Sequence, residues 1–386
     1  MATYDIHKLL EFTVKQNASD LILKVDAPPI LRVHGDLVRL KGEPLTPEDC
    51  RALPYSILTP EERQRFEDNL ELDLAYEIEG LARFRCNLMV QRGYVTSCYR
   101  VIPFVVKTIE ELGLPEIVSR LCEYPRGLVL VTGPTGSGKS TTQAAMIDYV
   151  NSRKPVHIVT VEDPIEFVHT DKKALIQQRE LGRDTLSFAD ALKYVLRQDP
   201  DVILIGEMRD LETIGLAITA AETGHLVFGT LHTVDAVQTV DRVIDVFPPY
   251  QQQQIRMQLS VNLVGVLSQT LVKTADRQGR VAAFETMEAI PAIRNLIREA
   301  KTHQIRSIIQ TGSKRGMFTL DQHLAQLVAD GIADYESARE KCVDPVDFED
   351  MVRAKKPELV GASRQQREPE KAEAQANPQQ RSGAAQ

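Results

Sequence analysis

A glycine-rich segment, 133–140, is the part of the chain best suited to hold a phosphate group. Its residues, with the one that follows, are Gly133, Pro134, Thr135, Gly136, Ser137, Gly138, Lys139, Ser140 and Thr141. Glycines let successive backbone N–H groups point at phosphate oxygens, where a Cβ atom would collide. Lys139 can reach the β- and γ-phosphates, and the Ser140 hydroxyl can ligate Mg²⁺. The segment therefore predicts a nucleoside triphosphate site at the start of a helix.

The elements that must position this loop are predicted from apolar runs. Buried strands are expected at 128–132, 157–161, 202–205 and 226–230, with helices between them. This alternation is typical of a parallel sheet with helices on both faces. Parallel strands all end at the same edge of a sheet, so residues that follow these strands are expected near the loop. From about Ser260 the chain is expected to become largely helical.

Carboxylates follow two of these strands. Glu207 comes shortly after 202–205, the layout of a Walker B acid, and we expect it to approach Mg²⁺ or to orient the attacking water. The alternative is a surface acid after a buried strand. Glu162 and Glu166 follow 157–161, where a carboxylate beside the γ-phosphate could polarise a water molecule. A carboxylate cluster that only caps the loop is the alternative there.

Histidines bracket the strand expected at 226–230. His232 lies at the same edge as the phosphate loop, where it could sense the γ-phosphate or have a structural role. His225 lies at the opposite end, and the residues alone indicate a structural role for it. Arginines can stabilise the charge of a phosphoryl-transfer transition state. Spacing does not choose among the arginines, which include Arg85 and Arg100, and a surface ion pair is the default for each.

Composition excludes several classes of protein. The chain of 386 residues is long enough for two or three domains. It has no apolar run long enough to span a membrane and no secretory signal at its N-terminus. Five scattered cysteines without a Cys-x-x-Cys pair argue against a disulfide framework or a zinc site and fit a reducing cytosol. The net charge of −8 and the absence of Trp disfavour a motor that acts on nucleic acid.

The pattern along the chain predicts four regions. Residues 1–102 are expected to form an α+β domain, with a helix from Ile6 and antiparallel strands within 72–102. Residues 103–113 are expected to be a linker, and 114–355 a domain of alternating strands and helices. The tail, 356–386, has few large apolar residues and is predicted to be disordered.

The motifs in this order resemble the secretion-type ATPases of the type II/type IV superfamily. They are the loop at 133–140, the acidic box at 162–166, the Gly206-Glu207 strand end and the histidine box at 225–232. Within that superfamily, Ala292–Glu299 is similar to a signature of pilus retraction ATPases, where it is needed for retraction rather than for nucleotide binding. The resemblance implies an α/β fold, with a PAS-like N-terminal domain before a RecA-like P-loop ATPase domain whose C-terminal part is helical. It also implies a ring of six subunits, with ATP and Mg²⁺ between the two domains.

The resemblance also assigns roles residue by residue. Lys139 and Ser140 match the Walker A residues, and Glu207 matches the Walker B glutamate, with Ser140 and Glu207 as the expected Mg²⁺ ligands. Other matches are the acids Glu162 and Glu166, the histidines His225 and His232, and the phosphate-reaching arginines Arg85 and Arg100. Of these, Glu166 is expected to position the water.

By the same resemblance, the chain is expected to be a hexameric motor for type IV pilus retraction and twitching motility. It would work in the cytoplasm at the inner-membrane base of the pilus machine, and would associate with the membrane only through partners. Those partners would be an inner-membrane platform protein and a paralogous retraction ATPase, with no nucleic acid among them. The long tail leaves an accessory retraction ATPase as an alternative. A pilus assembly or type II secretion ATPase is the weaker alternative, because the chain lacks an extra N-terminal domain and a four-cysteine site.

Overall fold

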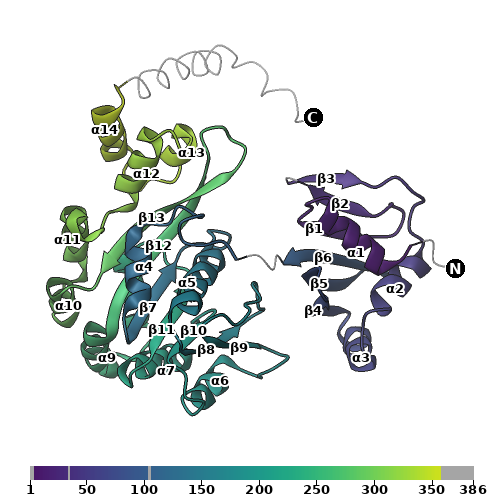
Figure 1. The fold of residues 1–386 in the computed structure, drawn as a ribbon, viewed down its shortest axis with the longest axis horizontal. Coiled ribbons are helices and arrows are strands. Elements are labelled where there is room, and N and C mark those ends of the chain that lie inside the picture. The colour runs from purple at the N-terminus through teal and green to yellow at the C-terminus, as the bar shows by residue number, and fades with distance from the viewer. Residues whose placement is uncertain (1–3, 34, 103–105, 358–386) are drawn as a thin grey trace, which may run out of the picture. The chain divides into compact units, whose positions relative to one another are not determined.

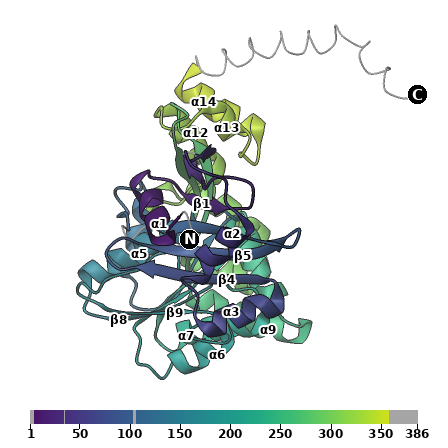
Figure 2. The same cartoon turned by 90° about the vertical axis from the view of Figure 1, so that its right-hand side faces the viewer.

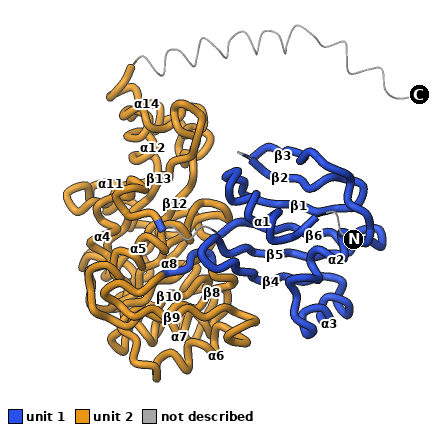
Figure 3. Tube along the Cα trace, turned by 45° about the vertical axis from the view of Figure 1, so that its right-hand side comes forward, with its two compact units in different colours: residues 1–106, 166–169 blue, residues 107–165, 170–386 orange. Residues whose placement is uncertain are grey.

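The computed structural model describes residues 4–33, 35–102 and 106–357 of the chain (Figure 1). These residues form two compact units (Figure 3). Unit 1 comprises residues 1–106 and 166–169, and unit 2 comprises residues 107–165 and 170–386. The boundary between Val106 and Lys107 falls inside the expected linker, of which 103–105 lie outside the described residues. The segment 166–169 groups with unit 1, although the sequence pattern assigned it to the domain at 114–355.

Unit 1 is an antiparallel sheet with helices packed on it. The strand order is β3-β2-β1-β6-β5-β4. The strands are β1 (Asp20–Leu23), β2 (Ile30–Val33), β3 (Asp36–Arg39), β4 (Glu71–Ile78), β5 (Ala82–Gln91) and β6 (Tyr94–Ile102). The helices α1 (Ile6–Lys15) and α2 (Pro47–Tyr55) contact β6, and α3 (Pro60–Asn69) contacts β4. The alternation within 72–102 is confirmed as β4, β5 and β6, and it buries Phe84, Leu88 and Tyr99 in the core of the unit.

Unit 2 is built on a seven-stranded sheet in the order β13-β12-β7-β11-β10-β8-β9. The strands are β7 (Gly127–Thr132), β8 (His157–Glu162), β9 (Leu175–Glu180), β10 (Val202–Ile205), β11 (Leu226–Leu231), β12 (Leu263–Lys273) and β13 (Arg280–Glu288). All neighbours pair in parallel except β12 and β13, which are antiparallel. The four expected strands are confirmed as β7, β8, β10 and β11, and the α/β fold class is confirmed with them.

Helices cover both faces of this sheet and continue beyond it (Figure 1). The helices that precede β12 are α4 (Glu116–Glu123), α5 (Lys139–Arg153), α6 (Phe188–Val195), α7 (Leu211–Glu222), α8 (Ala236–Asp245) and α9 (Pro249–Asn262). Those after β13 are α10 (Pro291–Arg298), η1 (Thr302–Gln304), α11 (Ile305–Thr311), η2 (Ser313–Arg315), α12 (Leu320–Ala329), α13 (Tyr335–Arg339) and α14 (Pro345–Lys355). In both views α12, α13 and α14 lie together at one end of the unit (Figures 1 and 2).

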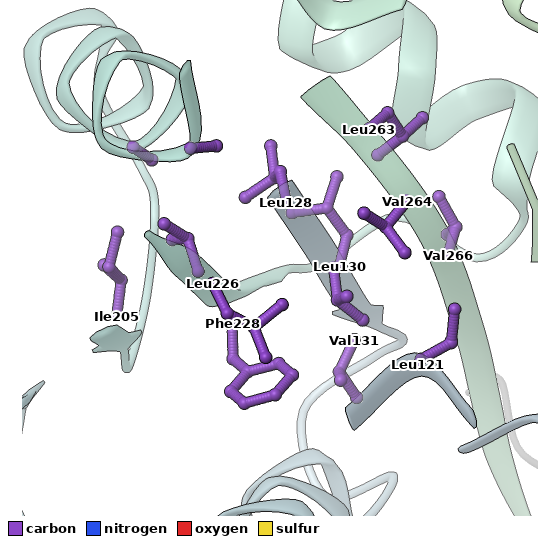
Figure 4. Packing of buried hydrophobic residues seen from close by; sticks show 14 of the residues in the cluster. Leu121, Leu128, Leu130, Val131, Ile205, Leu226, Phe228, Leu263, Val264 and Val266 are labelled. Carbon is purple, nitrogen blue, oxygen red and sulfur yellow. The ribbon is translucent and has the colours of Figure 1, made fainter. Parts of the chain in front are cut away.

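The central strands of unit 2 are buried along their whole length. Every residue of β7 and β11 is buried, as expected for parallel strands with helices on both faces. Figure 4 shows Leu128 and Leu130 of β7 beside Phe228 of β11, with Val266 of β12 on the other side. This packing fixes the end of β7, and therefore the start of the phosphate loop.

The expectation of a largely helical region from about Ser260 is wrong in its first part. Two strands, β12 and β13, form the edge of the main sheet there. Helix α9 passes directly into β12 at Leu263. No turn residue therefore marks the change from the helical repeat to the two-residue repeat of a strand. The strand β9 was also not predicted, because its sequence Leu175–Glu180 is polar and only partly buried.

The C-terminal helices bury a cluster of their own around Phe348, Val272 and Ala283. Within the described ranges, no helix combines the length and the apolar character that crossing a membrane requires. The tail predicted to be disordered, 356–386, lies outside the described residues from 358 onward.

Candidate active site

The phosphate loop joins the end of β7 to the start of α5. Gly133, Gly136 and Gly138 have φ values of +142°, +77° and +90°, in the region that favours glycine. A Cβ atom on Gly133 would lie 2.2 Å from the carbonyl oxygen of Gln269, so no larger residue fits the first position of the loop. Helix α5 begins at Lys139 without a side-chain cap, which leaves its first backbone N–H groups available to an anion.

The remaining loop residues divide by exposure. The loop is exposed at Pro134, Thr135 and Gly136. It is buried at Ser137 and half-buried from Gly138 to Thr141. The Lys139 ammonium donates to the carbonyl oxygens of Gly133, at 2.8 Å, and Pro134, at 3.2 Å. These two contacts hold the cation over the loop, and both acceptors are neutral. A phosphate oxygen is a stronger acceptor for an ammonium group than a carbonyl, so the ammonium can transfer to a bound phosphate.

Glu207 and His232 meet at the edge of the sheet where β10 and β11 end. The Nε2 atom of His232 lies 2.9 Å from the Oε1 atom of Glu207. The Arg209 guanidinium donates to both carboxylate oxygens of Glu207, with Nη2 at 2.6 Å from Oε2. Burial alone would raise the pKa of the Glu207 carboxyl, but Arg209 and then His232 outweigh it and hold that pKa below its usual value. Glu207 is therefore an ionised acceptor at neutral pH.

Glu162 ends β8, the strand next to β10. Its Oε1 atom accepts hydrogen bonds from Thr160 Oγ1 at 2.7 Å and from Gln178 Nε2 at 3.2 Å. A Cβ atom on Gly206 would come within 3.1 Å of the Glu162 Cα atom, so glycine lets the two strand ends approach each other. The structure thus brings Glu162, Glu207 and His232 to one edge of the unit 2 sheet, the edge at which β7 passes into the loop.

His225 lies at the other end of β11 from His232. Its Nδ1 atom lies 2.9 Å from the Ala220 carbonyl oxygen and 3.2 Å from Thr223 Oγ1, at the end of α7. The length of β11, about 20 Å at about 3.3 Å per residue, separates the two histidines. Within this chain the geometry fits the structural role that the residues alone indicated. The catalytic role that the resemblance implies for His225 stays a prediction.

Three further candidates belong to unit 1. Arg85 on β5 is directly opposite Arg100 on β6, and both side chains are exposed. The Arg100 Nε atom donates to the buried Asp20 carboxylate at 2.8 Å, and this contact, with a smaller contribution from Glu166, raises the pKa of Arg100. Arg85 is 4.0 Å from Asp73. Glu166 thus groups with the arginines of unit 1 and not with Lys139 within unit 2.

Two residues that hold the site were not singled out from the sequence: Arg209 was one of several arginines that spacing does not choose among, and Gln269 was not a candidate. Arg209 is only two positions after Glu207, and this proximity was the available signal. Gln269 on β12 donates from Nε2 to the Ser137 carbonyl oxygen at 2.7 Å, and no signal pointed to it because β12 itself was not predicted.

The donor set fits a magnesium nucleotide. Mg²⁺ prefers oxygen ligands and usually takes one or two from the protein and the rest from phosphate and water. The Ser140 hydroxyl and the ionised Glu207 carboxylate offer oxygen atoms of this kind. Among the described residues, no group of three or more His, Cys, Asp or Glu side chains could hold a metal without a substrate.

Comparisons with known proteins agree with this geometry. A family model described as Type II/IV secretion system protein matches residues 107–342. The Type IV pilus retraction ATPase PilT of Pseudomonas aeruginosa is 56% identical over 89% of this chain and 100% of its own length. A twitching motility protein of Neisseria gonorrhoeae is 51% identical over 88% of this chain and 90% of its own. The Type IV pilus ATPase PilU of P. aeruginosa is 41% identical, over 86% and 87%.

A solved structure is similar along almost the whole described chain. It is the crystal structure of the pilus retraction motor PilT with bound ADP, with a TM-score of 0.84 and 47% identity. The alignment covers 89% of this chain and 98% of the solved one. With the phosphate loop and Glu207 both in place, the chain is a P-loop ATPase that belongs to the type II/IV secretion system protein family.

Proposed function

We propose that this chain is the motor that hydrolyses ATP to retract type IV pili and so drives twitching motility. One observation carries the proposal, namely 56% identity over the full length of a relative named as a pilus retraction ATPase. The identity to the relative named PilU is lower, at 41%, which favours the principal retraction motor over the accessory one. The loop and Glu207 supply the chemistry that such a motor needs.

In the proposed reaction the loop amides and Lys139 hold the β- and γ-phosphates, and Ser140 and Glu207 hold Mg²⁺. When bound, Mg²⁺ neutralises charge on the phosphate oxygens. Lys139 leaves the carbonyl oxygens of Gly133 and Pro134 and follows the phosphate charge. His232, within 2.9 Å of Glu207, orients that carboxylate and reports whether a γ-phosphate is present. Glu162, anchored by Thr160, keeps a second carboxylate at the same strand edge.

The remaining groups belong to the assembled motor. We propose a homohexamer in which Glu166 positions the attacking water and Arg85 and Arg100 reach the phosphates. Closure around ATP and reopening after product release would then convert hydrolysis into motion. The platform protein at the inner-membrane base of the pilus machine would receive that motion, and a paralogous retraction ATPase would assist. In this scheme the chain works in the cytoplasm and touches the membrane only through these partners.

Two measurements on the purified chain and its host test the proposal. Phosphate release from Mg-ATP should be detected for the unmodified chain and lost in Lys139→Ala. The fold should stay intact, because Lys139 is half-buried on the loop and is not part of the hydrophobic core of unit 2. Deletion of the chain in its host should leave cells with abundant surface pili that do not twitch. Cells without pili would instead mean an assembly ATPase, and unchanged twitching would mean an accessory role.

A further inference from the structure

Gln269 is a buried polar residue that contacts both ends of the phosphate loop. It lies on β12, next to Ser268, which pairs with Thr132 at the end of β7, and the residue is 3% exposed. At the start of the loop, its backbone carbonyl oxygen lies 2.2 Å from the position of a Cβ atom on Gly133. At the end of the loop, its side-chain Nε2 atom donates to the Ser137 carbonyl oxygen at 2.7 Å.

The hydrogen bond to Ser137 fixes the direction of a backbone N–H group. The Ser137 C=O and the Gly138 N–H belong to one trans peptide, so they lie in one plane and point in opposite directions. Because Gln269 holds the carbonyl toward β12, the Gly138 N–H points away from β12. A Cβ atom on Gly138 would also lie 3.2 Å from Gln269 Nε2, so the side-chain amide of Gln269 packs against the Ser137–Gly138 peptide.

The Gln269 side chain contributes a hydrogen-bond donor to the site as well as its volume. Only the NH₂ end of the amide can donate to a carbonyl, so the orientation of the group follows from its partner. The Oε1 atom of Gln269 is buried and has no hydrogen-bond partner in the described part of the chain. A buried acceptor without a partner destabilises the folded state, so an apolar side chain would be preferred if packing were the only requirement.

We propose that Gln269 is a positioning residue for nucleotide binding, which holds the phosphate loop in the form that presents the Gly138 N–H to a phosphate oxygen. It acts through the Ser137–Gly138 peptide and does not itself touch the nucleotide. The inference rests on nucleotide binding by the loop and is independent of what the motor moves.

Two substitutions separate this role from simple packing. Gln269→Met keeps the length of the side chain and removes the donor, so the Kd for a fluorescent ADP analogue should rise about tenfold, as for the loss of one hydrogen bond. Gln269→Glu places a carboxylate against the Ser137 carbonyl oxygen at neutral pH. When protonated, the same group can donate again, and burial raises the pKa of the introduced carboxyl toward the assay range.

The dependence of the ADP-analogue Kd on pH distinguishes the two roles, because a residue that only fills space would not make the Kd ratio depend on pH. The ratio of the Kd of Gln269→Glu to that of the unmodified chain should be largest near pH 8 and should decrease toward about pH 6. The matched control is Gln278→Glu, which adds the same charge on the exposed turn between β12 and β13 and should leave the ratio at one.

Three outcomes decide the matter. A rise in Kd for Gln269→Met together with partial recovery of Gln269→Glu at low pH supports the proposal. Unchanged ADP binding in a folded Gln269→Met variant overturns it. If that variant does not fold, a Kd ratio of Gln269→Glu that is independent of pH overturns it instead. Failure of the unmodified chain to bind the ADP analogue would refute the loop assignment as well, which distinguishes the two failures.

Discussion

Replacement of Gly133 by Ala tests whether the geometry of the phosphate loop controls turnover. The added Cβ atom would lie 2.2 Å from the Gln269 carbonyl oxygen, whereas real Cβ contacts are essentially never under 3.0 Å. The loop must therefore move by about 0.8 Å, because β12 is held in the sheet between β7 and β13. A displacement of about 1 Å in a catalytic arrangement can lower the rate about a hundredfold. We expect kcat/KM for Mg-ATP to fall by about that factor, or about 2.7 kcal/mol in transition-state stabilisation.

The assay is steady-state phosphate release, with Gly93→Ala as the matched control. Gly93 lies in the turn between β5 and β6 at a φ of +81°, and a Cβ atom there would meet nothing within 4 Å. The control variant therefore places an alanine at a positive φ, which lowers folding stability by about 1–2 kcal/mol, but its Cβ atom collides with nothing. Its turnover should match that of the unmodified chain. If Gly133→Ala retained kcat/KM within about threefold of that chain, the loop would not be fixed as the structure indicates.

Three further predictions concern Glu207, His323 on α12 and Asp20 on β1. Glu207→Gln should bind ADP normally and lose about 10²–10⁴-fold in turnover, and full turnover would contradict its assignment. Burial lowers the pKa of His323 to about 4, so stability that His323 contributes above pH 6.5 should be lost as the pH falls from 6.5 to 4, by at most about 3 kcal/mol. Burial raises the pKa of Glu285 on β13 to about 7, so protonation of Glu285 stabilises the fold as the pH falls, opposite to the effect of His323. The difference in unfolding free energy between the unmodified chain and His323→Gln, followed against pH, should therefore isolate the contribution of His323. Asp20→Ala should lower the free energy of unfolding of unit 1, measured by urea titration, by about 1–3 kcal/mol, because Arg100 loses a partner at 2.8 Å; an unchanged free energy of unfolding would contradict this.

The candidate site of unit 2 could be predicted from the sequence because its polar residues directly follow buried parallel strands. The loop at 133–140 sits between a fully buried strand and a helix, so its motif had the required context. Glu207 and His232 were expected at one sheet edge because each follows a parallel strand, and their contact at 2.9 Å agrees with this. The same logic placed His225 at the far end, where the structure has it.

What could not be predicted depends on tertiary pairing. Leu263 follows α9 without a breaker, so nothing local marks the start of β12, and Gln269 has no motif of its own. The ion pair of Arg209 with Glu207 depends on side-chain conformation and not on periodicity. The grouping of Glu166 with unit 1 depends on neighbours far away in the chain, such as Arg100, which local patterns do not report.

The central claim is that this chain retracts pili by hydrolysing ATP, and imaging of single labelled pili tests it most directly. Retraction would be recorded in cells deleted for the chain and complemented with the unmodified gene, with Lys139→Ala or with Gly93→Ala. We predict retraction with the unmodified chain and with Gly93→Ala, and extended pili that never shorten with Lys139→Ala. Normal retraction in cells that carry only Lys139→Ala would contradict the account.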